Sequence, residues 1–417
     1  MKRQLPWLAA VILPFCAGAS AYVAFLPDEP MPQRPPAIRQ ASIDTAPPAA
    51  PELPPSEPSA AVPTLSQSAK QEIEQREHAL AAELRKMWTT DPDKLVNVID
   101  DASMNAPVSP SVSMLLAIAH AETNGHILDV SEAGAVGLAQ ATPIAIRQEN
   151  MFDDGKLFVT ADYLTGSRAY IMKKPLGDAD TIASLVVARD TDETRAKALG
   201  LLDSAFTLRR EGVDELALLE IFASKHYERS IEEADQHNLD VLRRLKTLLK
   251  HGTRAQLRAF RDKTRREYRA LKQTQMVTWA RYQHDLIAKR DRVLEQHFHE
   301  PAKRVWKNYP YDAGEYLGDA LDVRFSARKQ AAFLVRHLGR KAQEAKKLAG
   351  RNGSARDLNE MTAALYNGGS HNVKRMLAGL IVSLPETQRY MKKVPATARR
   401  LELAAGTYDI SHERTLR

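Results

Sequence analysis

The sequence predicts a mainly α-helical protein, long enough at 417 residues for one large or two ordinary domains. From Leu65 onward, apolar residues recur at helical spacing. Aromatic residues make up only 6% of the chain and glycine is modest at 19 residues, which favours helices over a β-sandwich. The 44% hydrophobic and 27% charged residues exclude a wholly disordered or fibrous chain. The single cysteine, Cys16, excludes an internal disulfide and a CxxC metal or redox site.

The N-terminal segment has the features of an export signal. Two cations, Lys2 and Arg3, precede a run that is mostly apolar over residues 5–26. This run is about as long as the roughly 20 residues that a membrane-spanning helix needs, and small residues ending at Ala21 also fit a cleavage site. We therefore expect residues 1–27 to be either an inner-membrane anchor, which we favour, or a cleaved signal peptide. Either one places the rest of the chain on the periplasmic side of the inner membrane.

A proline-rich segment follows. Twelve of the 23 prolines fall between Pro27 and Pro63, among alanine, serine and acidic residues. Such a composition forms neither a helix nor a central strand. We expect residues 28–64 to be an extended, semi-rigid tether.

Helical patterns begin after the tether. Residues 65–106 contain an amphipathic stretch at 71–88 and a second short helix at 93–104. A third helix is predicted to begin with Ser109 as N-cap and Pro110 in its first turn, and to end at Gly125. Its residues 112–125 are almost wholly apolar, which predicts a helix that is buried all round.

One acid, Glu122, lies in the last turn of this apolar helix. Burial raises the pKa of a carboxyl group, and a helix end can face a cleft. A general acid needs both properties, so Glu122 is the strongest catalytic candidate in the chain. Taken alone, such an acid is more often a helix-end residue that reaches water or a cap.

The residues after Glu122 strengthen the case. Ser131 is followed by Gly134-Ala-x-Gly-Leu-x-Gln140 and then by Thr142-Pro143. This spacing resembles the signature of the soluble lytic transglycosylase family, whose goose-type-lysozyme-like domain cuts peptidoglycan. The chain departs from the family pattern in two places: Thr123 replaces a serine, and Ala139 replaces a methionine of the cleft wall.

Two further motifs of the family appear much later in the chain. Residues 363–369 resemble its Ala-x-Tyr-Asn-x-Gly turn, and residues 386–392 resemble its Glu-Thr-x-x-Tyr-Val helix. Residues 322–334 match the preceding family helix more loosely. The resemblance implies a lysozyme-like core in two parts, residues 107–150 and 312–400, followed by a C-terminal tail at 401–417.

The resemblance also assigns roles. Glu122 is the single acid and base, and Ser131 and Gln140 contact sugar. The remaining residues shape the site, orient the acid or line the cleft: Tyr366, Asn367 and Tyr390. The expected reaction cleaves the β-1,4 bond between N-acetylmuramic acid and N-acetylglucosamine, forms a 1,6-anhydro product and uses no metal or cofactor.

The two parts of the core are separated by an insertion, residues 151–311. Its first half is expected to mix short helices and loops, with turn signals at 172–178. Its second half predicts two long helices joined by a tight turn at 251–253, with Thr253 as the cap of the second helix, which covers residues 254–298. The first of the two helices has an apolar stripe of leucines at 242, 245, 248 and 249. The predicted buried seam of the second helix consists of Leu257, Phe260, Tyr268, Leu271, Val277, Trp279, Leu286, Val293 and Leu294. We expect an antiparallel helical hairpin that projects from the core.

The insertion is basic. Residues 241–300 hold 16 lysines and arginines against 6 acids. A solvated helix face is one interpretation, and the other is an anionic partner: stem-peptide carboxylates, lipid headgroups or a protein of an envelope secretion or conjugation complex. Nucleic acid is not expected for an exported chain. His297 and His299 do not share a helix face, which argues against a metal site there.

Two other functions remain open. A hydrolytic muramidase would use water as the nucleophile and a second acid as the base, for which Asp129 and Glu132 are the candidates. A non-catalytic scaffold would bind glycan strands and recruit an envelope machine through the insertion. Ala139 and the insertion favour the scaffold, and the intact Glu122 argues against it.

Overall fold

The computed structural model of the chain describes residues 66–88, 92–106, 110–151, 156–222, 225–349, 355–381 and 384–406. The chain divides into two units, residues 1–63 and 64–417, and every described residue belongs to the second. The predicted anchor or signal segment, the tether and the end of the tail lie outside the described residues. Among the helices that the structure describes, none is long and apolar enough to cross a bilayer.

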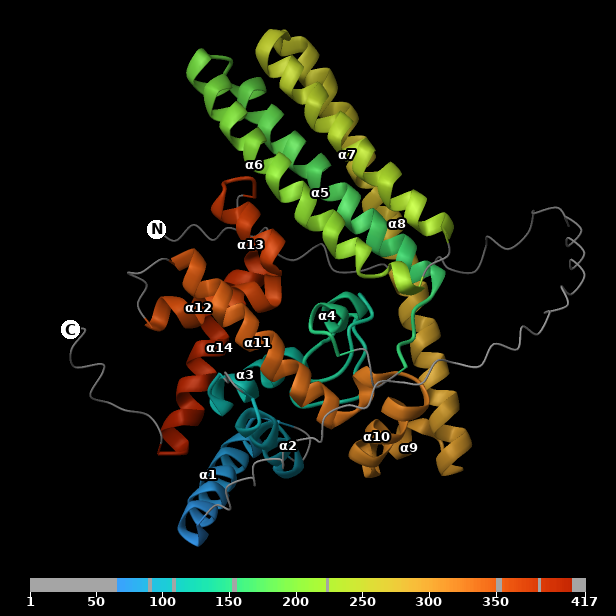
Figure 1. Cartoon of the computed structure of the whole chain (residues 1–417), viewed down its shortest axis with the longest axis vertical. Coiled ribbons are helices and arrows are strands. Elements are labelled where there is room, and N and C mark those ends of the chain that lie inside the picture. The colour runs from blue at the N-terminus through green and yellow to red at the C-terminus, as the bar shows by residue number, and fades with distance from the viewer. Residues whose placement is uncertain are drawn as a thin grey trace, which may run out of the picture. The chain divides into compact units, whose positions relative to one another are not determined.

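The described part of the chain is mainly helical, as predicted, and contains no β-strand beyond two isolated bridges at Val136. Figure 1 shows its arrangement. The α-helices are α1 (Gln67–Arg85), α2 (Asp93–Met104), α3 (Val112–Thr123), α4 (Pro143–Gln148), α5 (Ala161–Ala188), α6 (Asp192–Ala217), α7 (Lys225–His251), α8 (Arg254–Phe298), α9 (Ala302–Asn308), α10 (Pro310–Ala320), α11 (Ala327–Ala349), α12 (Ala355–Gly368), α13 (Ser370–Leu377) and α14 (Pro385–Ala404). Two 3-10 helices, η1 (Glu220–Phe222) and η2 (Val323–Phe325), complete the set.

Helix α3 is buried almost all round, as its apolar sequence predicts. Its N-cap is Ser111, whose hydroxyl accepts from the backbone N–H of Met114 at 3.3 Å. The predicted cap, Ser109, lies outside the described residues. The helix ends two residues before the predicted Gly125, because Asn124 adopts a left-handed conformation with φ 52°. Helix α3 packs mainly on α14 and also contacts α2 and α11, so segments from both ends of the described chain surround it.

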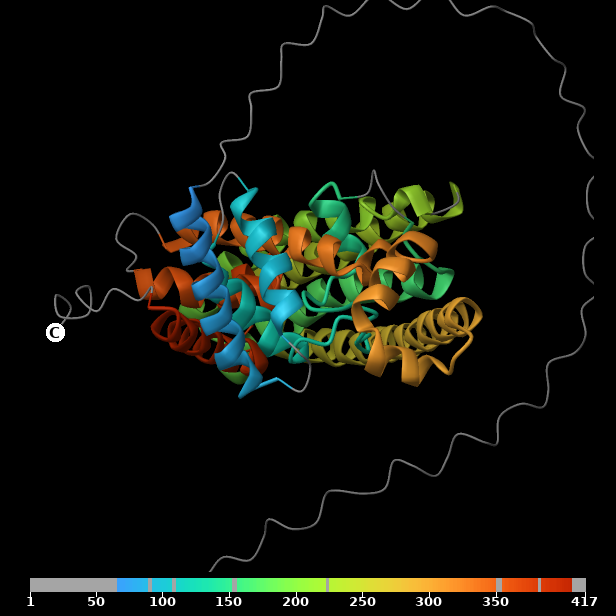
Figure 2. The same ribbon diagram turned by 90° about the horizontal axis from the view of Figure 1, so that it is seen from below.

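Residues 151–311, the segment expected to be an insertion, contain four long helices, α5 to α8, which pack against one another (Figures 1 and 2). The expectation of short helices and loops in its first half is wrong. The turn signals around Pro175 lie inside α5, which continues for 28 residues. Proline removes one backbone N–H and disfavours a helix interior. Here Pro175 is buried, so tertiary packing offsets the local preference.

The predicted hairpin is only partly correct. Helix α8 covers residues 254–298, and Thr253 forms the predicted cap. However, α8 packs chiefly along α5 and contacts α7 much less. Helix α7 packs on α5 and α6 instead, through the predicted leucine stripe of Leu242, Leu245 and Leu249. The insertion is therefore a four-helix arrangement rather than an isolated pair.

Candidate active site

Glu122 lies in the last turn of α3 and is half-buried. The hydroxyl of Tyr390, on α14, donates to its Oε1 at 2.8 Å. Burial and a neighbouring carboxylate, Glu386, raise the pKa of Glu122 to about 7, against the opposing effects of the Tyr390 hydrogen bond and of Lys393. Glu122 can therefore both hold and release a proton near neutral pH.

A cavity of about 380 Å³ opens beside Glu122. Four of the six predicted site residues line it, although two of them lie more than 200 positions downstream of the others: Glu122, Gln140, Tyr366 and Asn367. A fifth, Tyr390, reaches the site through its hydrogen bond to Glu122. The structure thus brings together residues that the sequence separates by the whole insertion.

The sixth residue, Ser131, lies in the loop between α3 and α4. Its hydroxyl accepts from the backbone N–H of Ala135 at 3.0 Å, and its own N–H donates to the Ala135 carbonyl at 2.9 Å. The residues that line the cavity include the neighbouring Ala133 rather than Ser131. In this structure Ser131 closes the loop, and a contact with sugar stays a prediction.

The loop after α3 is tight at Gly137, where φ is +70° and an added Cβ would collide with the side chain of Gln330. Gln330, on α11, accepts from the Leu138 N–H at 2.7 Å through Oε1. Its Nε2 donates to the carbonyls of Ile127 and Phe325 at 2.9 and 3.0 Å. One buried amide therefore holds the two sides of the loop at a fixed distance, and only glycine fits against it.

A buried ion pair also supports this loop. Arg324 and Asp322 are buried and paired at 2.7 Å. The Arg324 guanidinium also donates to the Gly134 carbonyl at 2.7 Å and to the Tyr282 hydroxyl at 2.8 Å. Because Tyr282 belongs to α8, this single side chain connects the loop after α3 to α8.

The loop ends at Gln140, which adopts φ 43°, a region uncommon for residues other than glycine. Its Nε2 donates to the Gly137 carbonyl at 2.9 Å. The preceding carbonyl, that of Ala139, accepts from the Tyr366 hydroxyl at 2.7 Å. Tyr366 thus holds the loop by its backbone, so the side chain at position 139 takes no part in this contact.

The neighbouring turn is also fixed. The Asn367 Oδ1 accepts from the Thr387 hydroxyl at 3.0 Å, which links α12 to α14. Burial, and then the charge of Glu122, raise the pKa of Tyr366 well above its ordinary value. Tyr366 therefore remains a neutral hydrogen-bond donor throughout the pH range in which Glu122 titrates.

The two acids proposed for a hydrolytic reaction lie elsewhere. Asp129 and Glu132 are both exposed. Asp129 lines a different cavity, together with Trp306 and Tyr311. Neither of them is among the residues that line the cavity of Glu122.

Three aromatic residues that line the cavity of Glu122 were not among the site residues predicted from the sequence. They are Tyr163 and Tyr170 from α5 and Trp279 from α8. The Trp279 indole packs over Gly166, where any Cβ would collide with it. Within the described residues, the buried indole N–H of Trp279 has no hydrogen-bond partner. The only signal in the sequence was the place of Trp279 in the predicted apolar seam of α8.

Three further ionisable residues, from α6 and α11, complete the lining of the cavity. They are Glu215, His337 and Lys341. The His337 Nδ1 lies 2.7 Å from Oε1 of Glu149, to which Arg340 also donates at 2.7 Å. Burial lowers the pKa of His337 to about 4, so this imidazole is neutral at pH 7.

The described residues contain no group of three or more histidine, cysteine, aspartate or glutamate side chains that could hold a metal ion. Of the pair considered in the sequence, His297 stacks on Tyr316 with ring centroids 3.6 Å apart, and His299 is the left-handed C-cap of α8.

Comparison with protein-family models, with curated proteins and with solved structures finds no match for this chain. An assignment of function therefore depends on the motif residues and on the geometry of the cavity described above.

Proposed function

We propose that this protein is a peptidoglycan lytic transglycosylase with a lysozyme-like catalytic core, residues 107–150 and 312–400, interrupted by the insertion. The observation that carries the proposal is the position of Glu122: a half-buried carboxyl at a helix end, beside a cavity, held by the Tyr390 hydroxyl and with a pKa near 7. The sequence motifs that resemble the family meet at this cavity.

The proposed reaction begins with Glu122 protonated. The carboxyl donates its proton to the glycosidic oxygen between N-acetylmuramic acid and N-acetylglucosamine while the bond from C1 to that oxygen breaks. The N-acetyl oxygen of the muramoyl residue bonds to C1, which makes the reaction one of the substrate-assisted exceptions to paired-carboxylate catalysis. The N-acetylglucosamine leaves with a free hydroxyl.

The second step uses the same side chain as a base. Ionised Glu122 takes the proton of the muramoyl 6-hydroxyl, whose oxygen attacks C1 and displaces the N-acetyl oxygen. The product is a 1,6-anhydro ring, and Glu122 is again protonated. One residue serves both steps because its pKa lies close to neutral pH, where donation and abstraction of a proton are both accessible. Asp129 and Glu132, the two acids considered as the base of a hydrolytic reaction, lie outside this cavity, which argues against either of them in that role.

Product analysis tests this proposal. We expect mass spectrometry of peptidoglycan digested by the full-length protein to show 1,6-anhydro ends. Reducing ends would identify a hydrolytic muramidase instead. Binding of peptidoglycan with no product from an intact, folded protein would identify a non-catalytic scaffold.

The location and partners are part of the same proposal. Residues 5–26 would anchor the protein, or direct its export with cleavage near Ala21, so that it acts on the periplasmic side of the inner membrane. The insertion would be the part that contacts an envelope secretion or conjugation complex. Protease accessibility in spheroplasts tests the location, and a pull-down with full-length protein carrying substitutions on the surface of α8 tests the contact.

A further inference from the structure

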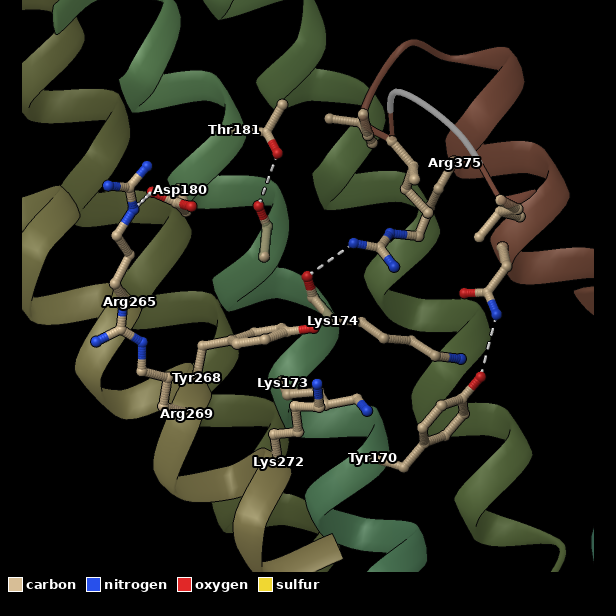
Figure 3. Close-up of a pocket in the computed structure, with 15 residues that line it drawn as sticks. Tyr170, Lys173, Lys174, Asp180, Thr181, Arg265, Tyr268, Arg269, Lys272 and Arg375 are labelled. Carbon is tan, nitrogen blue, oxygen red and sulfur yellow. Dashed lines mark hydrogen bonds and ion pairs between the residues drawn. The ribbon is translucent and has the colours of Figure 1, made fainter. Parts of the chain in front are cut away.

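A second, larger cavity of about 740 Å³ lies between α5, α8 and the segment around α13 (Figure 3). Six cations line it, against one acid, Asp180. They are Lys173, Lys174, Arg265, Arg269, Lys272 and Arg375. A recess with this lining has a strongly positive potential, which attracts anions.

Half of these cations are balanced by acids. Arg265 pairs with Asp180 at 2.7 Å. The Arg375 guanidinium donates through Nε to the buried Asp178 at 2.8 Å. Lys174 is buried, with Glu215 at 3.9 Å. These pairs hold the walls of the recess in place.

The other three cations, Lys173, Arg269 and Lys272, have no acidic partner among the described residues. In Figure 3 the side chains of Lys173, on α5, and Lys272, on α8, lie next to one another. Burial, and then the positive charges of Lys272, Lys174 and Arg375, lower the pKa of Lys173 to about 8. The cations of the recess thus lie close enough to act on one another, and three of the six have no acid to balance them among the described residues.

The recess adjoins the cavity of Glu122. Tyr170 lines both, and its hydroxyl accepts from the Asn372 side chain at 3.1 Å. The ammonium groups of Lys173 and Lys174 lie over the Tyr170 ring, 4.9 and 4.3 Å from its centroid. A substrate that occupies the first cavity therefore has a cationic recess next to it, and Tyr170 belongs to the lining of both.

We propose that this recess binds the carboxylates of the peptide stem that a muramoyl residue carries while its glycan occupies the neighbouring cavity. The inference rests on the proposed function, since the glycan would bring the peptide to the recess. Lys173, Arg269 and Lys272 would bind the carboxylates, and Tyr170 would separate sugar from peptide. Peptide-bearing strands would accordingly be better substrates than strands without peptides.

The first experiment compares two substrates. The double variant R269E/K272E reverses two exposed charges of the recess on α8. We expect its kcat/KM to fall about tenfold on peptide-bearing glycan strands, equivalent to ~1.4 kcal/mol, and to be unchanged on strands stripped by an amidase. The matched control K263E/R266E makes the same charge change at exposed positions of the same helix outside the recess, and should alter neither rate.

The second experiment does not require turnover. Calorimetric titration of the full-length protein with a synthetic stem tetrapeptide should show binding that weakens about tenfold in R269E/K272E and with rising salt. The same peptide with its carboxylates amidated should not bind. Inorganic phosphate serves as a competitor, because a phosphate group offers the same cations a similar charge.

The outcomes separate this inference from the proposed function. The stem-peptide site is overturned if R269E/K272E loses kcat/KM equally on stripped and peptide-bearing strands. It is also overturned if neither the charge reversal nor the amidation changes the binding of the tetrapeptide. Phosphate binding without tetrapeptide binding also overturns it and identifies a phosphate site. A protein that binds the tetrapeptide through Arg269 and Lys272 but cleaves neither strand contradicts the proposed function and leaves the peptide site standing.

Discussion

The cavity of Glu122 has two walls of different origin. One wall comes from α3, the loop after it and α12, and it presents the carboxyl group of Glu122, to which the Tyr390 hydroxyl of α14 donates. The other comes from α5, α6 and α8 of the insertion, and it presents aromatic rings and Glu215. The first wall contains the groups that the proposed reaction needs, whereas the second offers surfaces that fit a role in recognition.

The two walls are also held differently. Buried polar side chains, Gln330 and Arg324, hold the loop of the first wall through specific hydrogen bonds to its backbone. The insertion is held largely by apolar packing, with a separate hydrophobic cluster where α5, α6, α7 and the start of α8 meet. Specific bonds fix a position more closely than apolar packing does. The comparison predicts that the first wall controls rate and the second controls affinity.

The largest expected effect is on the first wall. We predict that Glu122→Gln lowers kcat on peptidoglycan about a thousandfold or more, because the amide neither donates nor accepts the proton. Substrate binding should persist. Release of soluble muropeptides, measured against Glu132→Gln as an exposed control, tests this. Near-normal turnover by Glu122→Gln would refute the assignment.

The same variant has a consequence for stability. The pKa of Glu122 is raised in the folded protein, so folding favours the protonated form and is disfavoured by ionisation. The cost is absent below about pH 4.5 and is fully present above pH 7. Glu122→Gln should therefore raise the free energy of unfolding above pH 7 by up to about 3 kcal/mol, with no gain at pH 4. Denaturant titration at both pH values measures this.

The next effect concerns the link between the walls. Arg324→Met leaves the buried Asp322 without its partner and removes the bonds to the loop and to Tyr282. We predict a loss of roughly 3–5 kcal/mol in the free energy of unfolding. The exposed Arg328→Met, on α11, should change it by less than about 0.5 kcal/mol. Similar unfolding free energies for the two variants would show that the walls do not depend on this ion pair.

A smaller effect tests the second wall. Trp279→Leu keeps an apolar side chain but removes the ring and the unpartnered N–H from the cavity. We predict a rise in KM of about tenfold with kcat nearly unchanged, because the interaction is with bound sugar in both the ground and the transition state. A fall in kcat with an unchanged KM would show that Trp279 acts in the transition state. It would contradict the prediction that the second wall controls affinity alone.

The smallest expected effect is a shift of the pH profile. The Tyr390 hydrogen bond lowers the pKa of Glu122, so Tyr390→Phe should raise it further above 7. In the wild type, kcat/KM should fall as pH rises through about 7, where the acid is lost. In Tyr390→Phe this fall should move to higher pH by less than about one unit, the scale of a single hydrogen bond. An unmoved profile would mean that Tyr390 does not set the ionisation of Glu122.

The sequence correctly predicted those helices whose positions depend on nearby residues, through apolar spacing and end caps. Helix α2, the bounds of α8 and the place of Glu122 at the end of a buried helix followed from apolar spacing and from caps. It predicted α5 wrongly, because the cost of Pro175 is local whereas the packing that outweighs it comes from distant segments. The predicted seam of α8 also placed Val277 inside, where it is exposed, and omitted Tyr282, which is buried.

In the site too, residues within local motifs were predicted, and residues that depend on tertiary packing were not. The motifs identified Glu122 and the residues that meet it, but no local pattern indicated that Trp279 and Tyr170 would complete the cavity. No local pattern indicated the role of Arg324 either. Its hydrogen-bond partners are Gly134, 190 positions earlier in the loop after α3, and Tyr282, 42 positions earlier in α8. Such partners become visible only when the fold has brought the segments together.

The length and continuity of helix α8 connect two distant parts of the molecule. It is one uninterrupted helix of 45 residues, about 70 Å long. At one end its Leu257 packs in the outer cluster of the insertion, and at the other its Arg290 donates to the Leu128 carbonyl, six residues after the proposed acid, at 2.6 Å. A molecule that bound α8 near Leu257 would therefore be connected, through one continuous helix, to the loop that follows Glu122.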